Sequence, residues 1–295
     1  MRLALLVALV ALAAAYIAVL AHSIRKARAR APGDSWAPTL HQSLVGFVTN
    51  FFDSLGIGNF APTTVWFRAA KMVPDERIPG TMNVGHTLPV MLMGLLFIES
   101  VEVETTTLVS MIAASIAGAW FGAGRVASLR REHVQLGMGV ALLLAALFMG
   151  GFQIVGQPVG ADALGLEGVE LVIAGAGIAV LGALMTIGVG LYAPCMVLVS
   201  LMGMNPIAAF PIMMGACAFL MPVASTRFLK DEACALRPGL GLTLGGIPGV
   251  LLAVLLVKSL PLDALRWLVV AVVLITAVAM LRAARRTAPP DQRRL

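Results

Sequence analysis

Two polar pairs interrupt apolar stretches of the chain and could carry proton or ion chemistry. Asn50 and Asp53 are three residues apart in one stretch, and Asn83 and His86 are three residues apart in the next. Residues at this spacing share a helix face, so we expect both pairs to line one polar cavity. A carboxylate in an apolar segment is costly unless it is protonated, paired or hydrated, and an imidazole exchanges protons near neutral pH. Asp53, His86 and Asn50 are therefore candidates for proton or cation coupling.

Structural roles stay open for the same side chains. Asp53 could cap the helix that follows it, because short acidic side chains bond to nearby backbone groups. His86 could be a neutral residue that is hydrogen-bonded inside a helix interface.

A glycine-rich peptide occurs twice and predicts two sharp turns. Residues 55–62 read LGIGNFAP, and residues 187–194 read IGVGLYAP. Glycine permits the backbone angles of a tight turn, and proline suits the first turn of a helix. Each peptide is thus expected to start a half-helix, near Ala61 and Ala193, whose unpaired N–H groups favour an anion. A packing kink is the alternative. The candidate substrate-binding residues are Gly56, Gly58, Asn59, Ala61, Thr63, Asn83, Gly188, Gly190, Tyr192, Ala193 and Cys195.

The elements that must position these residues are apolar helices. Of the 295 residues, 59% are hydrophobic and 12% are charged, which is too little polar surface for a soluble protein of this length. No run of about ten alternating residues suggests a barrel strand. The sequence therefore predicts an all-α integral membrane protein without a soluble domain. Its apolar runs are 3–21, 42–67, 80–98, 105–124, 134–152, 169–202, 206–224, 239–257 and 263–281.

Charge distribution predicts the topology. Basic residues gather in segments 22–40, 68–79, 125–133 and 225–238 and in the C-terminal tail, so we expect these in the cytoplasm. Run 42–67 then has two cytoplasmic flanks, which a single crossing cannot satisfy. Run 169–202, with 34 residues, is too long for one ordinary span and must begin and end outside. Both runs are thus predicted to be re-entrant or broken helices.

The two glycine peptides belong to an internal repeat. Residue pairs such as Pro74 and Pro206 recur 132 positions apart, as do the peptides themselves. The topology gives the two copies opposite orientations, which is typical of secondary transporters. Asp53 pairs with Met185 in this register, so the fold symmetry does not require an acid there. We divide the chain into an N-terminal transmembrane helix with a basic linker (1–40), repeat one (41–152), an external loop (153–168), repeat two (169–281) and a basic tail (282–295).

Motifs for other functions do not occur. The sequence has no P-loop, zinc signature, nucleophile elbow or dinucleotide fingerprint, so we expect no catalytic residue, no metal site and no cofactor. The net charge of +6 is explained by membrane topology rather than by nucleic acid. An intramembrane enzyme using His86 and Asp53 as an acid–base pair is a minor alternative.

The chain resembles the sulfite exporter TauE/SafE family of membrane permeases. The likeness covers about residues 41–281 and rests on the paired glycine turns, on IPGTMNVGHTLP at residues 78–89, and on the G-x3-G segments at 118–122 and 245–249. It implies secondary export, or in some members import, of a small sulfur-containing or organic anion such as sulfite or sulfoacetate.

The leading hypothesis is therefore a multi-pass secondary transporter of the cell (inner) membrane that exports such an anion, with its N-terminus outside and its C-terminus cytoplasmic. Its partners would be a small anion, a proton or sodium as coupling ion, and membrane lipid, with a homo-oligomer permitted. A passive anion channel or facilitator on the same scaffold is the alternative, because paired half-helices also build pores.

Overall fold

Every regular element in the described part of the computed structural model is a helix. The structure describes residues 1–30, 36–126, 131–155, 163–185 and 190–287. Seven helices of these ranges are long and apolar enough to cross a membrane, which confirms the predicted class. The elements are α1 (Arg2–Arg30), α2 (Leu40–Ser54), α3 (Phe60–Ala69), η1 (Asp75–Arg77), α4 (Ile78–Ser100), α5 (Thr105–Val126), α6 (Arg131–Ile154), α7 (Gly168–Met185), α8 (Tyr192–Leu201), η2 (Pro206–Ala208), α9 (Ala209–Lys230), α10 (Leu236–Ser259) and α11 (Leu262–Thr287).

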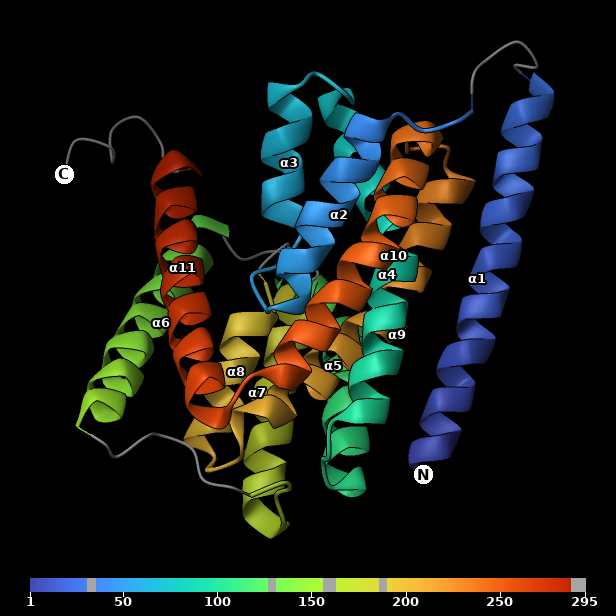
Figure 1. Cartoon of the computed structure of the whole chain (residues 1–295). Coiled ribbons are helices and arrows are strands. Elements are labelled where there is room, and N and C mark those ends of the chain that lie inside the picture. The colour runs from blue at the N-terminus through green and yellow to red at the C-terminus, as the bar shows by residue number, and fades with distance from the viewer. Residues whose placement is uncertain (31–35, 127–130, 156–162, 186–189, 288–295) are drawn as a thin grey trace. The chain divides into compact units, whose positions relative to one another are not determined.

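The run at 42–67 forms two helices joined by a tight turn. α2 has 15 residues and α3 has 10, so both are shorter than the roughly 20 residues of an ordinary span. They lie side by side and antiparallel, with the turn at one end (Figure 1). Gly56 and Gly58 have φ angles of 96° and 89° in this turn, a region that L side chains rarely adopt. The predicted break in this run is therefore present.

The same order of elements occurs twice along the chain. α2, α3, η1, α4, α5 and α6 follow one another in the first half, and α7, α8, η2, α9, α10 and α11 follow in the second. The short helices α3 and α8 both have 10 residues, and both are followed by a 3-10 turn. This order agrees with a duplicated sequence.

The chain folds into two compact units, and each unit combines helices from both halves of the sequence. Unit 1 contains residues 1–100 and 217–259, and unit 2 contains residues 101–216 and 260–295. In unit 1, α10 packs against α2 and α4. In unit 2, α5 packs against α7, and α6 lies beside α11 (Figure 1). The two compact units therefore do not coincide with the two predicted sequence repeats.

Gly118 and Gly245, the first glycines of the two G-x3-G segments, lie where two helices approach each other closely. A Cβ at Gly118 of α5 would overlap the backbone carbonyl of Ala179 in α7. A Cβ at Gly245 of α10 would overlap the carbonyl of Ser43 in α2. Small residues at such crossings let helix backbones approach in membranes, so these motifs serve packing.

The apolar core of unit 1 surrounds the α2–α3 hairpin. Its buried members come from α2, α3, the segment after α3, α4 and α10, and they include Val45, Phe67 and Leu242. A second cluster holds α1 in place through Tyr16 and Leu20, and the Tyr16 hydroxyl donates to the Val84 carbonyl at 3.0 Å.

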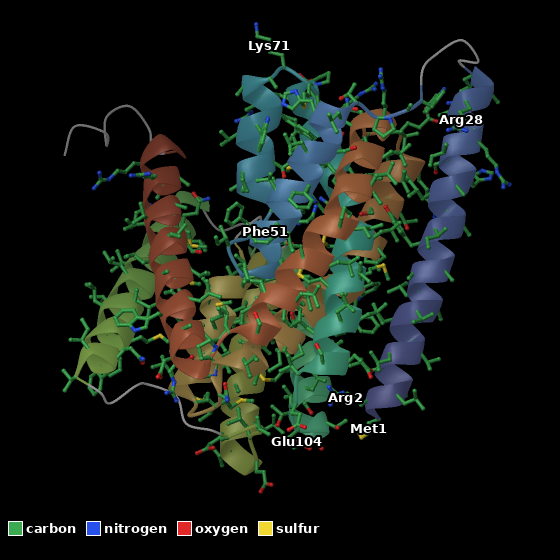
Figure 2. The ribbon with its side chains drawn as sticks, viewed as in Figure 1. Met1, Arg2, Arg28, Phe51, Lys71 and Glu104 are labelled. Carbon is green, nitrogen blue, oxygen red and sulfur yellow. The ribbon has the colours of Figure 1, made fainter. Side chains whose placement is uncertain are left out.

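Basic segments of unit 1 gather at one end. Arg28 of α1 and Lys71, which follows α3, lie at the same end, and Arg2 lies at the opposite end (Figure 2). Arg2 donates to the carbonyls of Ile98 and Glu99 at the C-terminus of α4. The distribution within unit 1 agrees with the sidedness that the charges predict.

Candidate functional site

A chain of buried polar side chains connects α2, α3 and α4 inside unit 1. The Asn59 side-chain amide donates to Asp53 Oδ2 at 2.9 Å and lies 3.4 Å from Asn50 Oδ1. His86 Nδ1 lies 3.1 Å from the same Asn50 oxygen, and His86 Nε2 lies 3.1 Å from Thr63 Oγ1. All five side chains are at most 5% exposed. We call Asn50, Asp53, Asn59, Thr63 and His86 the polar chain.

The hydrogen bonds of Asn50 determine the tautomer of His86. Asn50 Nδ2 donates to the Gly46 carbonyl at 2.7 Å, so the oxygen of the same amide must face His86. An oxygen can only accept, and His86 Nδ1 therefore carries a hydrogen. In neutral imidazole Nε2 is then an acceptor, and the Thr63 hydroxyl donates to it. If His86 gained a proton, the Thr63 hydroxyl would rotate to accept.

The polar chain is attached to the N-terminus of α3. Asn59 is the N-cap residue of α3, yet its side chain makes no capping bond because it is bonded to Asp53 instead. Pro62, in the first turn, has no N–H to donate. Among the described residues, no acceptor pairs with the N–H groups of Phe60 and Ala61, and Ala61 is exposed. This helix end therefore keeps unpaired donors and the partial positive charge that favours an anion.

Asp53 is a buried carboxyl group without a counter-charge among the described residues. It is 1% exposed, and the ion pairs found in the described part of unit 1 lie elsewhere. Asn59 donates to it from both its side-chain amide and its backbone N–H, and these neutral donors do not offset the loss of water around a carboxylate. The group therefore needs a proton or a bound cation, which is the requirement of a coupling site in a membrane.

Helix α10 closes the polar chain from one side. A Cβ at Gly246 would meet the side chains of Asn50 and Pro89, so the backbone of α10 lies directly on Asn50. The ring centroids of Phe60 and His86 lie 6.2 Å apart, so the Phe60 ring covers the imidazole from another side. Close packing around the amides keeps their geometry fixed.

Asn83 does not join the other predicted polar residues. Its amide donates to the Pro79 carbonyl of its own helix at 3.0 Å, and its side chain is only half-buried. The sequence predicted one cavity for both polar pairs. The structure brings together Asn50, Asp53 and His86, and it adds Asn59 and Thr63 from the turn and α3.

The second glycine turn lies in unit 2 and is described in part. Gly188 lies outside the described residues. Gly190 is exposed, whereas Tyr192, Ala193 and Cys195 are buried at the start of α8. Cys195 N–H donates to the Leu191 carbonyl at 3.0 Å, so the backbone is helical from its first turn, as predicted.

A second buried polar contact was not predicted from the sequence. Thr87 Oγ1 and Ser225 Oγ lie 2.7 Å apart between α4 and α9, and both side chains are fully buried. Thr243 of α10 donates to the Gly85 carbonyl at 2.8 Å. Isolated Ser and Thr residues in apolar helices show no spacing pattern. Most of them also bond to their own backbone, so the sequence does not indicate which ones contact another helix.

Comparison with known proteins identifies one family. No curated protein and no solved structure matches the chain. The family model described as Sulfite exporter TauE/SafE matches residues 171–295, a stretch that includes most of α7 and all of α8 to α11. The resemblance inferred from the sequence is thereby confirmed over this stretch. Residues 171–295 of the chain carry the signature of the sulfite exporter TauE/SafE family, a family of membrane transporters.

Proposed function

We propose that the chain is a secondary transporter of a small sulfur-containing or organic anion, coupled to a proton or ion gradient. The family match and the apolar helices support a membrane transporter. The observation that carries the coupling is the hydrogen bond between Asp53 and Asn59, because it joins a buried acid to the N-cap of α3.

The geometry favours cooperative binding of a proton and the anion. An ionised Asp53 would place a negative charge beside the N-terminus of α3, where it opposes an incoming anion. A protonated Asp53 removes this charge and leaves the unpaired N–H groups of Phe60 and Ala61 to the substrate. Anion binding should therefore strengthen proton binding, and the reverse follows by linkage. In this scheme the two ions move in the same direction, and sodium at Asp53 would act in the same sense.

His86 and Thr63 extend the proposed proton site. The Thr63 hydroxyl can donate to a neutral imidazole or accept from a protonated one without movement of any heavy atom. Thr63 is also the residue that follows Pro62 at the α3 start. A change in the charge of His86 would therefore alter its hydrogen bond to Thr63 in the first turn of α3.

The topology completes the proposal. The α2–α3 hairpin returns to the end of unit 1 from which it enters, which supports a re-entrant segment with both ends in the cytoplasm (Figure 1). The repeated order of elements supports a second, inverted hairpin formed by α7 and α8. Alternating access would then come from movement of one part of the transporter against the other.

The first test is a flux assay in proteoliposomes. Uptake of sulfite, sulfate, thiosulfate, sulfoacetate and acetate would be measured with and without an imposed pH gradient. We expect at least one sulfur-containing anion to accumulate above equilibrium when the pH gradient is present. Movement of no anion under any gradient, with reconstitution confirmed, would reject the substrate class. Flux that only equilibrates the anion under every gradient would favour the channel alternative.

A further inference from the structure

A large cavity lies beside the basic end of α1, apart from the polar chain. Its volume is about 1150 Å³, and it is bounded by α1, by the segment between α9 and α10, and by Arg77 next to α4. All of its lining residues belong to unit 1. The predicted orientation places it at the cytoplasmic membrane surface.

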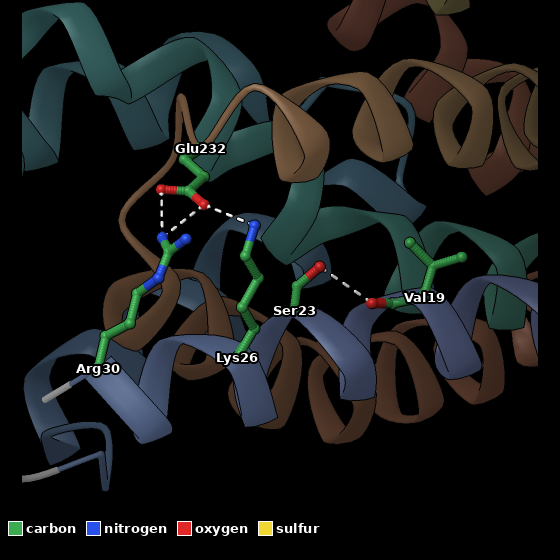
Figure 3. Close-up of polar contacts among 5 residues, drawn as sticks. All are labelled: Val19, Ser23, Lys26, Arg30 and Glu232. Carbon is green, nitrogen blue, oxygen red and sulfur yellow. Dashed lines mark hydrogen bonds and ion pairs between the residues drawn. The ribbon is translucent and has the colours of Figure 1, made fainter. Parts of the chain in front are cut away.

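The cavity is strongly basic. Five Lys or Arg side chains and one carboxylate, Glu232, are among its lining residues. Glu232 accepts hydrogen bonds from Lys26 at 3.0 Å and from Arg30 at 2.7 Å (Figure 3). These bonds lower the pKa of Glu232, so the carboxylate is ionised and neutralises part of the charge. No carboxylate among the described residues pairs with Arg77 or Lys230. The cavity therefore retains an excess of positive charge for an anionic ligand.

The walls indicate a lipid rather than a small soluble anion. Ala18, Val19, Leu229 and Leu236 line the cavity together with the basic groups, so an apolar wall continues from the charged end along α1. Trp36 lies at the cavity, and tryptophan is enriched at the depth of lipid headgroups. α1 is itself mostly uncovered by protein, because only 17% of its most apolar window is buried. Acyl chains can therefore reach the cavity from the side.

We propose that this cavity binds the headgroup of an anionic phospholipid, with the phosphate near Arg77 and Lys230 and an acyl chain along α1. Basic pockets between membrane helices are suited to phosphate-bearing headgroups. The bound lipid would join α1 to the α9–α10 segment in addition to the ion pairs of Glu232. The proposal does not depend on the transported substrate.

Binding of defined lipids to the purified full-length protein tests the proposal. Native mass spectrometry in detergent would compare dioleoylphosphatidylglycerol with dioleoylphosphatidylcholine, and inorganic phosphate would serve as the soluble anion. We expect phosphatidylglycerol to bind at least about tenfold more tightly than phosphatidylcholine, and phosphate to compete only at far higher concentration. The variant Arg77→Gln/Lys230→Gln should weaken phosphatidylglycerol binding by about 25-fold, because each basic residue near a surface contributes about a fivefold factor.

The matched control variant also removes two positive charges from the same end of unit 1. Arg25 and Lys71 are exposed and do not line the cavity, so Arg25→Gln/Lys71→Gln should change the affinity by less than about twofold. The charge-conserving variant Arg77→Lys/Lys230→Arg should retain binding, which separates loss of charge from loss of fold. Equal affinity for the two lipids, or equal loss in both glutamine variants, would refute the proposal. Phosphate binding as tight as phosphatidylglycerol binding would refute the lipid and indicate a free-anion site.

Discussion

Replacing Asn50 by alanine should destabilise the protein far more than the same change at Asn83. Both amides donate to the carbonyl four residues earlier in their own helix, at 2.7 Å and 3.0 Å, so this bond is lost in both variants. Only Asn50 also accepts from His86 and faces Asn59. The comparison therefore isolates the contacts that connect α2, α3 and α4.

The magnitude follows from the groups left unpaired. Without Asn50, the Nδ1–H group of the fully buried His86 loses its acceptor, at a cost of about 1–3 kcal/mol. The space of the missing amide against α10 adds about 1 kcal/mol. We expect a loss of about 2–4 kcal/mol for Asn50→Ala. For Asn83→Ala we expect less than about 1 kcal/mol, because its side chain is half-buried and bonds only to its own helix.

Reversible unfolding in mixed micelles, with helix content followed by circular dichroism, would give both free energies of unfolding. The wild type and both variants would be measured in the same detergent mixture at neutral pH. Equal losses at the two positions would contradict the connected geometry of the polar chain. A loss below about 1 kcal/mol at Asn50 would show that its oxygen does not hold His86.

Three further changes test packing, turn geometry and charge. Gly118→Ala should lower the free energy of unfolding by about 1–3 kcal/mol, because its Cβ would overlap a backbone carbonyl of α7. Gly175→Ala should be tolerated, because a Cβ there meets no atom within 4 Å. Thermal unfolding in detergent would compare the two variants. Gly58→Ala should cost about 1–2 kcal/mol through its φ of 89° alone, since nothing lies within 4 Å of a Cβ there, and the same unfolding assay measures it. Glu104 accepts the N–H groups of Thr107 and Thr106, and these bonds lower its pKa from 4.5 to about 2. Its contribution, about 1 kcal/mol as a helix cap, is present above about pH 5 and is lost as the pH falls toward 2, so the stability difference between wild type and Glu104→Gln should shrink over that window.

Local properties of the sequence were sufficient to predict the break in run 42–67, whereas the turn of run 169–202 lies partly outside the described residues. Run 42–67 has basic flanks on both sides, and its glycines at 56 and 58 take backbone angles that other residues avoid. These are local properties, so they can be read from one stretch of chain. Pairing of α2 with α10 and of α5 with α7 joins the two halves of the sequence, and no local pattern specifies it.

The candidate site was predicted in part. Asp53, Asn50 and His86 were selected because each interrupts an apolar run, and the structure connects them. Asn59 and Thr63 were predicted as substrate-binding residues of the turn, and the structure shows that their side chains bond to Asp53 and His86. A small rotation of α4 about its axis decides whether Asn83 or His86 faces α2, and such a rotation is set by packing rather than by sequence spacing.

Proton coupling through Asp53 is the central claim, and anion accumulation under a pH gradient tests it most directly. The measurement compares wild type, Asp53→Asn and Asp75→Asn in proteoliposomes with the anion that the wild type carries. Asp75 is an exposed carboxylate of the same unit, paired with Arg68, so its variant controls for loss of an acid. We predict that the pH gradient drives accumulation in the wild type and in Asp75→Asn, whereas Asp53→Asn only equilibrates the anion. Accumulation by Asp53→Asn at the wild-type level would contradict the account.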